Sequence, residues 1–208
     1  SDMDGGPHHP VGPNETMQVD FTVNQEAATL WFHPHALGTT AEQVYAGLAG
    51  LIFVEDDNSD QLDLPKDYGV NDFPLIIQDR SFDADNQFDY AGAYDPDGTY
   101  GDTLLVNGTI NPFVEVKNEQ IRLRLVNGSN ARNYTFGLEN GAEFHQIASD
   151  GGFLEQPVAL TSVTLTPGER AEIIVDLSGY AEGDTVKLMD GNATVLSLNV
   201  TEEADAQT

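Results

Sequence analysis

Residues 121–126 read Ile-Arg-Leu-Arg-Leu-Val and indicate the fold class of the chain. Successive side chains of an extended backbone point to opposite faces, so the isoleucine and the leucines share one face while Arg122 and Arg124 share the other. This alternation is typical of a half-buried antiparallel strand. It predicts a sheet whose arginine face is open to water.

Similar short apolar runs, rich in Val, Ile, Leu, Phe and Thr, recur along the chain between Gly, Pro, Asn or Asp residues. Such runs, bounded by turn residues, predict strands. The predicted strands are 17–23, 28–33, 50–55, 72–80, 103–106, 113–116, 120–127, 133–138, 143–149, 162–165, 169–176, 185–190 and 193–200, and only residues 40–47 read as a short helix. The predicted class is therefore all-β, a β-sandwich or a barrel with Greek-key connections.

The predicted strands fall into two units of unequal size. Residues 57–71 lack strand periodicity and are expected to link a first unit at 1–56 to a second at 72–200, with 201–208 as a polar tail or interdomain linker. The second unit has enough strands for a complete sandwich. The first has too few, so we expect it to be part of another sandwich, with Trp31 and Phe32 near its core. Its open strand edges favour self-association.

Composition argues against several kinds of partner. The 208 residues include 35 acids and 8 bases, which gives a formal net charge of −27, so we expect no binding of nucleic acid or anionic lipid. No apolar run reaches the roughly 18 residues of a membrane span. Cysteine is absent, so a metal would have to bind histidine or carboxylate. The absence of cysteine is compatible with either side of a membrane, so it does not indicate the cellular compartment. The acidic, lysine-poor surface fits a protein working at high salt or an ordinary acidic protein.

Two histidines have the spacing of metal ligands. His33 and His35 flank Pro34, and in extended backbone this spacing points both imidazoles to the same side. Neutral imidazoles without cysteine favour copper or zinc. The alternative is a pair of surface histidines in a strand.

The sequence around this pair resembles a known family. The segment 29–56, which contains Trp-Phe-His-Pro-His at 31–35, resembles the second copper-ligand motif of the multicopper oxidases, the laccase and bilirubin-oxidase family built from three cupredoxin domains. Met-Asp-Gly-Gly-Pro-His at 3–8 resembles the loop after the family's first His-x-His motif. Residues 101–108 and 123–132, and the stretch from 147–152 through 167–170, resemble its second domain. Resemblance covers nearly the whole chain and implies cupredoxin-like sandwiches, one complete and one partial.

The resemblance also implies a chemistry. It makes His33 and His35 copper ligands in the trinuclear cluster that reduces dioxygen to water, and it makes Asp4 the acid that delivers protons there. A turn residue in Asp-Gly-Gly is the alternative for Asp4. In the complete enzyme, the partners would be dioxygen and a small reducing substrate such as a phenol, a bilirubin-like pigment or a low-valent metal ion.

Other polar residues have simpler interpretations. His8 and His9 follow Gly-Gly-Pro and are expected in a solvated loop, and His145 is expected to be a hydrogen-bonded structural histidine. The series Asp56-x-Asn58-x-Asp60 has calcium-loop spacing but has Gln61 where such a loop needs glycine, so a solvated acidic loop is expected.

The chain departs from the family pattern in what it lacks. It shows one of the family's four His-containing motifs, has no cysteine for the type 1 copper, and lacks a third domain. We therefore expect a fragment of an oxidase that is inactive alone and holds little or no copper. A non-catalytic cupredoxin-like module with a structural or binding role is the alternative.

Overall fold

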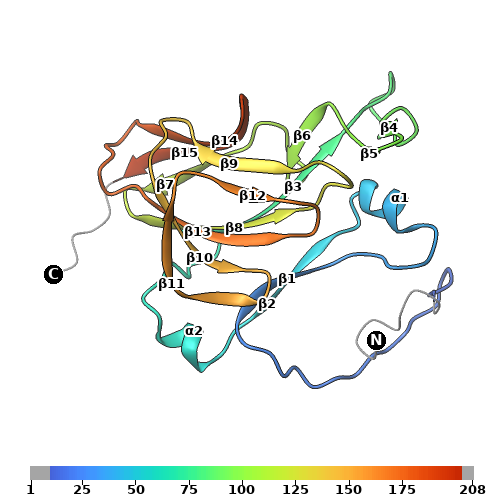
Figure 1. Cartoon of the computed structure of the whole chain (residues 1–208), viewed down its shortest axis with the longest axis horizontal. Coiled ribbons are helices and arrows are strands. Elements are labelled where there is room, and N and C mark those ends of the chain that lie inside the picture. The colour runs from blue at the N-terminus through green and yellow to red at the C-terminus, as the bar shows by residue number, and fades with distance from the viewer. Residues whose placement is uncertain (1–9, 203–208) are drawn as a thin grey trace.

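The computed structural model of the chain describes residues 10–202. In this part of the chain two sheets form a β-sandwich, as predicted, and a separate hairpin lies against one of them (Figure 1). The six-stranded sheet has the order β11-β10-β13-β8-β3-β6 and the five-stranded sheet has the order β12-β9-β14-β15-β7. The strands of the six-stranded sheet are β3 (Asp72–Arg80), β6 (Thr103–Val106), β8 (Gln120–Asn127), β10 (Phe144–Ser149), β11 (Gly152–Leu160) and β13 (Arg170–Asp176). Those of the five-stranded sheet are β7 (Phe113–Lys117), β9 (Tyr134–Leu138), β12 (Val163–Leu165), β14 (Thr185–Asp190) and β15 (Ala193–Glu202).

The core lies between the two sheets. Ile121, Leu123 and Leu125 of β8 are 0% exposed and pack there, as their alternation predicts. Neighbouring strands are mostly antiparallel, but β3 pairs with β8, and β7 with β15, in parallel. These parallel neighbours are far apart in sequence, which gives the crossed connections of a Greek-key sandwich.

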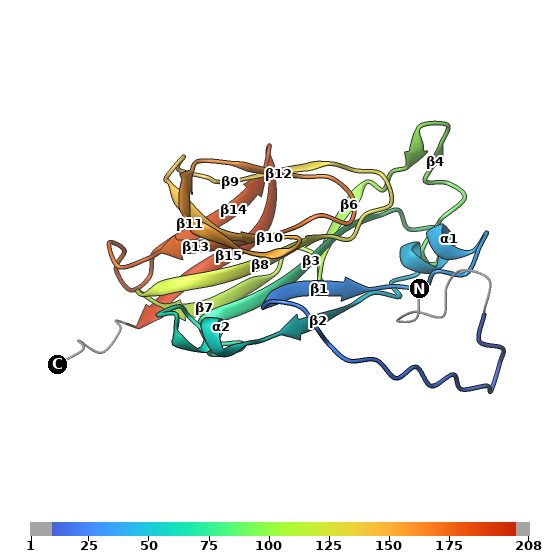
Figure 2. The ribbon, with the colours of Figure 1, turned by 60° about the horizontal axis from the view of Figure 1, so that its bottom comes forward.

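The arginine face of β8 is not open to water, and this prediction was wrong. Arg122 is 5% exposed and Arg124 is 8% exposed, because the hairpin of β1 (Ala28–Phe32) and β2 (Gly50–Val54) lies over them. Figure 2 shows this hairpin along the outer side of the six-stranded sheet. The sheet is therefore covered on both faces where the hairpin crosses it.

Two other predictions about the N-terminal part were wrong. Residues 17–23 form no strand, and Met17, Phe21 and Val23 are 42%, 47% and 60% exposed. Alternation makes a strand only where a neighbouring edge takes up the backbone hydrogen bonds, and within residues 10–202 β1 and β2 pair only with each other. Phe32 is 57% exposed rather than near a core, while Trp31 is half-buried.

The shorter elements complete the fold. The predicted helix is present as α1 (Thr40–Tyr45). A second helical turn, α2 (Asp57–Gln61), begins inside the predicted connector. Asp56 and Ser59 form a capping box there, with Ser59 N–H donating to Asp56 Oδ1 at 2.7 Å. The remaining strands are the small pair β4 (Tyr94–Asp95) and β5 (Gly98–Thr99). Among residues 10–202, no helix is long and apolar enough to cross a membrane.

Candidate metal centre

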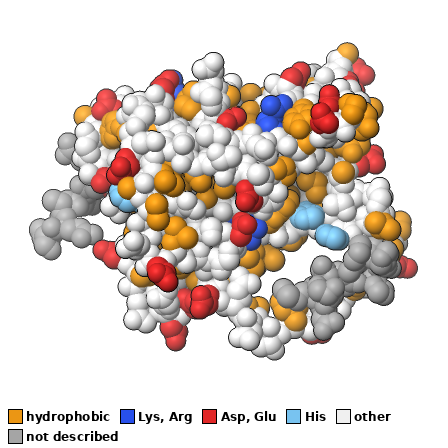
Figure 3. Space-filling view, viewed as in Figure 1, with side chains coloured by type: hydrophobic (Ala, Val, Ile, Leu, Met, Phe, Trp, Pro, Cys, Tyr) orange, Lys and Arg blue, Asp and Glu red, His pale blue; other side chains and the backbone are white. Residues whose placement is uncertain are grey.

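The His-x-His pair follows directly after β1. His33 is half-buried and His35 is exposed. Their ring centroids are 5.8 Å apart and the ring planes are inclined by 31°, so both imidazoles lie on the same side of the chain as the spacing predicts. Figure 3 shows histidine side chains open to the surface on this face of the molecule.

The contacts of His33 leave one ring nitrogen available. Its Nδ1 lies 2.9 Å from the carbonyl oxygen of Pro34. Because a carbonyl only accepts, this contact assigns the proton to Nδ1 and leaves the lone pair on Nε2. Metal-binding histidines commonly donate their second nitrogen to a carbonyl in this way, so the arrangement fits an ion that binds imidazole, such as copper or zinc.

The pair has an aromatic neighbour on one side and an open groove on the other. Trp31 packs against His33 with ring centroids 4.5 Å apart. A groove of about 410 Å³ runs past His33 and is lined by Phe32, Pro34, Gly47, Leu48 and Ala49 as well. The site is thus reachable from outside, and its walls are apolar.

Two imidazoles are not a complete site. In the part of the chain that the structure describes, no group of three or more His, Cys, Asp or Glu side chains could hold a metal ion. Asp4, His8 and His9 lie outside the described residues, so their placement relative to His33 stays a prediction. Further ligands would have to come from elsewhere.

His145 takes no part in this site. It is exposed on β10, and its imidazole forms no hydrogen bond within residues 10–202, so the expected structural role was wrong. The charge of His145 contributes to lowering the pKa of Asp176, after the larger effect of hydrogen bonds from Ser178. His145 therefore offers a control position for any experiment on His33 and His35.

A buried polar cluster fixes β1 upstream of the histidines. Thr29, which is 2% exposed, donates through Oγ1 to Glu172 Oε1 at 2.6 Å and accepts from Arg124 Nη1 at 2.9 Å. Arg124 also donates to Asp72 through Nε at 2.8 Å. Arg122 donates to Glu172 through Nε at 2.9 Å. Two arginines and two carboxylates thus neutralise one another beneath the hairpin, as buried charges require.

A second contact fixes α1 downstream of them. Tyr45 is 1% exposed, and its hydroxyl accepts from Ser81 N–H at 2.7 Å and donates to the carbonyl of Asp89 at 3.3 Å. The Arg80 guanidinium lies 4.5 Å from the centre of the Tyr45 ring and donates to the carbonyl of Val44 at 2.8 Å. Burial lowers the pKa of Arg80, and this effect exceeds that of the negative charge of Asp79, which raises the pKa. Sequence reasoning missed these contacts, although charged residues inside apolar strands, such as Arg80 and Glu172, were a signal for them.

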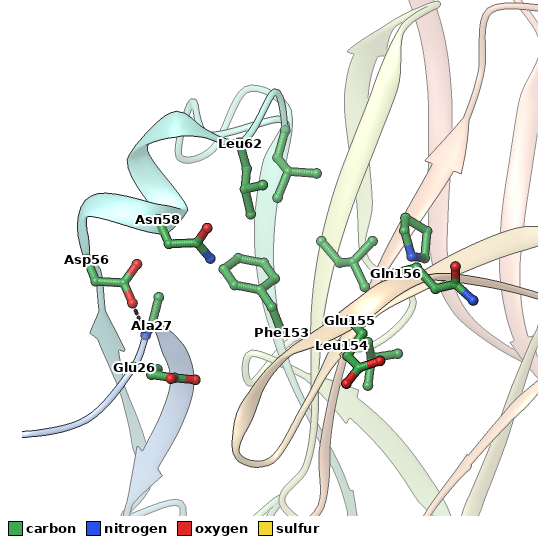
Figure 4. Close-up of a pocket in the computed structure, with 12 residues that line it drawn as sticks. Glu26, Ala27, Asp56, Asn58, Leu62, Phe153, Leu154, Glu155 and Gln156 are labelled. Atoms are coloured by element: carbon green, nitrogen blue, oxygen red, sulfur yellow. Dashed lines mark hydrogen bonds between the residues drawn. The ribbon is translucent and has the colours of Figure 1, made fainter.

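Another hollow, of about 480 Å³, lies between α2 and β11. Figure 4 shows Phe153 of β11 pointing towards Asn58 on α2, with Glu26 and Asp56 on the hairpin side. The carboxylate of Asp56 already accepts hydrogen bonds from the backbone. Its Oδ2 accepts from Ala27 N–H at 2.9 Å, and the hydrogen bonds from the Ser59 and Ala27 backbones lower the pKa of Asp56. The calcium-like spacing at Asp56 thus serves a helix cap and the start of β1.

Family models of known proteins match most of the chain. Two models described as multicopper oxidase match residues 2–59 and 71–184. The "Multicopper oxidase mco" of Staphylococcus haemolyticus is 47% identical over 194 residues, which cover 93% of this chain and 42% of that protein. The "Cell division protein FtsP" of Escherichia coli K12 is 45% identical over 191 residues, which cover 91% of this chain and 39% of that protein.

Solved structures give the same result. A multi-copper oxidase from Pediococcus acidilactici superposes with a TM-score of 0.94 at 43% identity, over 99% of this chain and 43% of that one. The McoA multicopper oxidase of Aquifex aeolicus has a TM-score of 0.89 at 38% identity, over 100% of this chain and 49% of that one. The chain thus spans less than half the length of these relatives.

Proposed function

Since the chain belongs to the multicopper oxidase family and has its cupredoxin-like fold, we propose that it supplies His33 and His35 to the copper cluster of a copper-dependent oxidase. The complete enzyme would oxidise a phenol, a pigment or a low-valent metal ion and reduce dioxygen to water. The observation that supports this most is the pair itself: two imidazoles on one side of the chain, with His33 Nδ1 engaged by a carbonyl at 2.9 Å.

The residues of this chain would hold and serve the cluster. Both imidazoles present a neutral nitrogen as ligand, and Pro34 restricts the backbone between them. Copper, when bound, supplies the redox chemistry between reducing substrate and dioxygen. Reduction of dioxygen also consumes protons, and Asp4 is proposed to deliver them.

The proposal assigns the remaining parts of the site to other portions of the enzyme. Two imidazoles fall short of the three or more ligands that a closed copper site needs. A type 1 copper needs a thiolate, and this sequence has no cysteine. We therefore expect the chain alone to be inactive, and a third domain to bring the missing ligands.

Oxygen uptake by the complete polypeptide that contains this sequence tests the proposal. After copper loading, with a phenolic substrate, His33→Ala and His35→Ala should each lower the rate by at least about 100-fold, because ligand loss disables the cluster. His145→Ala is the matched control and should leave the rate unchanged. Full activity in either ligand variant would overturn the proposal.

A second candidate function follows from the comparison. Relatives named "Cell division protein FtsP" are 45% identical to this chain, close to the 47% of a multicopper oxidase. A non-catalytic cupredoxin-like module with a binding role is therefore the alternative. Such a module would show no oxygen uptake in the complete polypeptide, with or without His33 and His35.

A further inference from the structure

We propose that Thr29 and Tyr45 are positioning residues, which hold the His33–His35 pair in a chelating arrangement by fixing the chain on both sides of it. The inference rests on the proposed function, because it assumes that the pair binds metal. It assigns a role in the metal site to the six-stranded sheet and to the segment that follows β3, neither of which contributes a ligand.

The upstream contact acts through one face of β1. Thr29, Trp31 and His33 alternate along the chain, so their side chains point to the same side of the extended segment. Thr29 is held by Glu172 at 2.6 Å and by Arg124 at 2.9 Å, and both partners lie on the six-stranded sheet. Trp31 then packs against His33 at 4.5 Å. The position of the first imidazole is thus linked to the buried cluster by a short row of contacts.

The downstream contact acts through α1. The Tyr45 hydroxyl bridges Ser81 N–H and the Asp89 carbonyl, and the ring packs under Arg80. Asn130 adds a hydrogen bond of 2.8 Å to the carbonyl of Ala41, at the other end of the helix. The helix is too short to be stable without such contacts. Without them, the segment that follows His35 would be free to move.

Between the two contacts the connection is short. β1 ends at Phe32 and α1 begins at Thr40, so residues 33–39 are held at both ends. A segment held this way has fewer conformations to lose when both imidazoles bind one ion or two adjacent ions, which favours binding. Releasing either end should weaken binding at the imidazoles even where the fold persists.

The variants remove one hydroxyl each and have matched controls. Thr29→Val keeps the side-chain shape at the upstream contact, and Tyr45→Phe keeps the ring under Arg80 at the downstream contact. The controls are Thr164→Val and Tyr180→Phe. The hydroxyls of Thr164 and Tyr180 also form hydrogen bonds, with Thr135 and Asn140, but on exposed parts of the sandwich. Thr29→Val disturbs a buried cluster and could prevent folding. In that case Tyr45→Phe alone tests the positioning role.

This chain is titrated with Zn(II) while ¹⁵N NMR records the signals of each imidazole. Zn(II) bound to surface carboxylates then does not contribute to the measured affinity. In the wild type, His33 should show the Nδ1-protonated tautomer and both imidazoles should respond to the ion. Thr29→Val and Tyr45→Phe should weaken the site by about 10-fold, the lower end of the loss when outer contacts of a metal ligand are removed. They should also mix the two tautomers of His33, whereas both controls should match the wild type.

Two other outcomes separate the inference from the proposed function. If wild-type imidazoles bind Zn(II) but affinity in Tyr45→Phe stays within about 2-fold and the tautomer is unchanged, the positioning role is overturned and the proposed function stands. If neither wild-type imidazole responds to Zn(II) or to Cu(II), the pair is not held in a chelating arrangement and the positioning role is overturned. The proposed function, in which other portions of the enzyme supply further ligands, is then judged separately by the oxygen uptake of His33→Ala and His35→Ala in the complete polypeptide.

Discussion

Replacing Glu172 by glutamine should destabilise the protein strongly, because the change removes one charge from a buried cluster of four. Glu172 is 2% exposed and Asp72 is 3% exposed, and together they face Arg122 and Arg124. Glu172→Gln keeps the shape of the side chain but leaves two guanidinium groups with one carboxylate. Breaking a buried ion pair in this way costs about 3–5 kcal/mol of unfolding free energy.

The matched control is Glu139→Gln. Glu139 also pairs with a base, Lys187 at 3.2 Å, but the two side chains are 53% and 36% exposed. Such a surface pair contributes less than about 1 kcal/mol. For a chain of this size the difference corresponds to a fall in melting temperature of about 6–20 °C for Glu172→Gln and a few degrees at most for the control.

Urea denaturation followed by two signals measures the effect. Trp31 is the single tryptophan of the chain and lies on the hairpin, so its fluorescence reports the hairpin, while far-UV circular dichroism reports the sandwich. In Glu172→Gln the fluorescence transition should come at lower urea than the circular dichroism transition, since the cluster joins hairpin to sheet. If the fluorescence midpoint of Glu172→Gln equals that of Glu139→Gln, the buried cluster does not hold the hairpin to the sheet.

Salt and pH should change the stability of the chain, and its copper content should depend on ligands from outside it. The formal net charge is −27, so the melting temperature should rise as the salt concentration is raised from ~0.05 to 2 M and repulsion is screened. Sedimentation should show self-association through the hairpin edges. A monomer whose melting temperature does not change with salt contradicts both expectations. After dialysis against a chelator the chain alone should hold little or no copper by metal analysis, and stoichiometric, chelator-resistant copper would mean that this chain supplies more ligands than His33 and His35. Hydrogen bonds lower the pKa of Asp56 below its ordinary 3.8, so its charge stabilises the fold above that pH and the contribution is lost as pH falls through the lowered pKa. Urea melts of Asp56→Asn should therefore show a larger deficit at pH ~6 than at pH ~3, and an equal deficit would exclude this origin.

The fold of the sandwich could be predicted from sequence because its strands carry their own pattern. Ile121, Leu123 and Leu125 alternate with polar residues, and all three are buried as expected. The same pattern could not show that the hairpin covers Arg122, because alternation says which residues share a face and not what lies over it. β11 was missed because Gly152 and Pro157 interrupt its sequence, and proline is tolerated there since β11 is an edge strand.

The candidate site was predictable in part for the same reason. The spacing of His33 and His35 is local, and local geometry was enough to place both imidazoles on one side. The contacts of Thr29 and Tyr45 join residues far apart in sequence, such as Thr29 and Glu172. The prediction of a strand at 17–23 failed because pairing depends on a neighbouring edge, which the sequence of the strand itself does not specify.

Anomalous diffraction at the copper absorption edge, from crystals of the complete polypeptide that contains this sequence, would locate bound copper relative to His33 and His35. We expect copper density within bonding distance of an imidazole nitrogen on both His33 and His35, with Nε2 as the ligand atom of His33, whose Nδ1 contacts Pro34. Copper-loaded crystals with anomalous density elsewhere and none beside this pair would contradict the assignment of His33 and His35 as copper ligands.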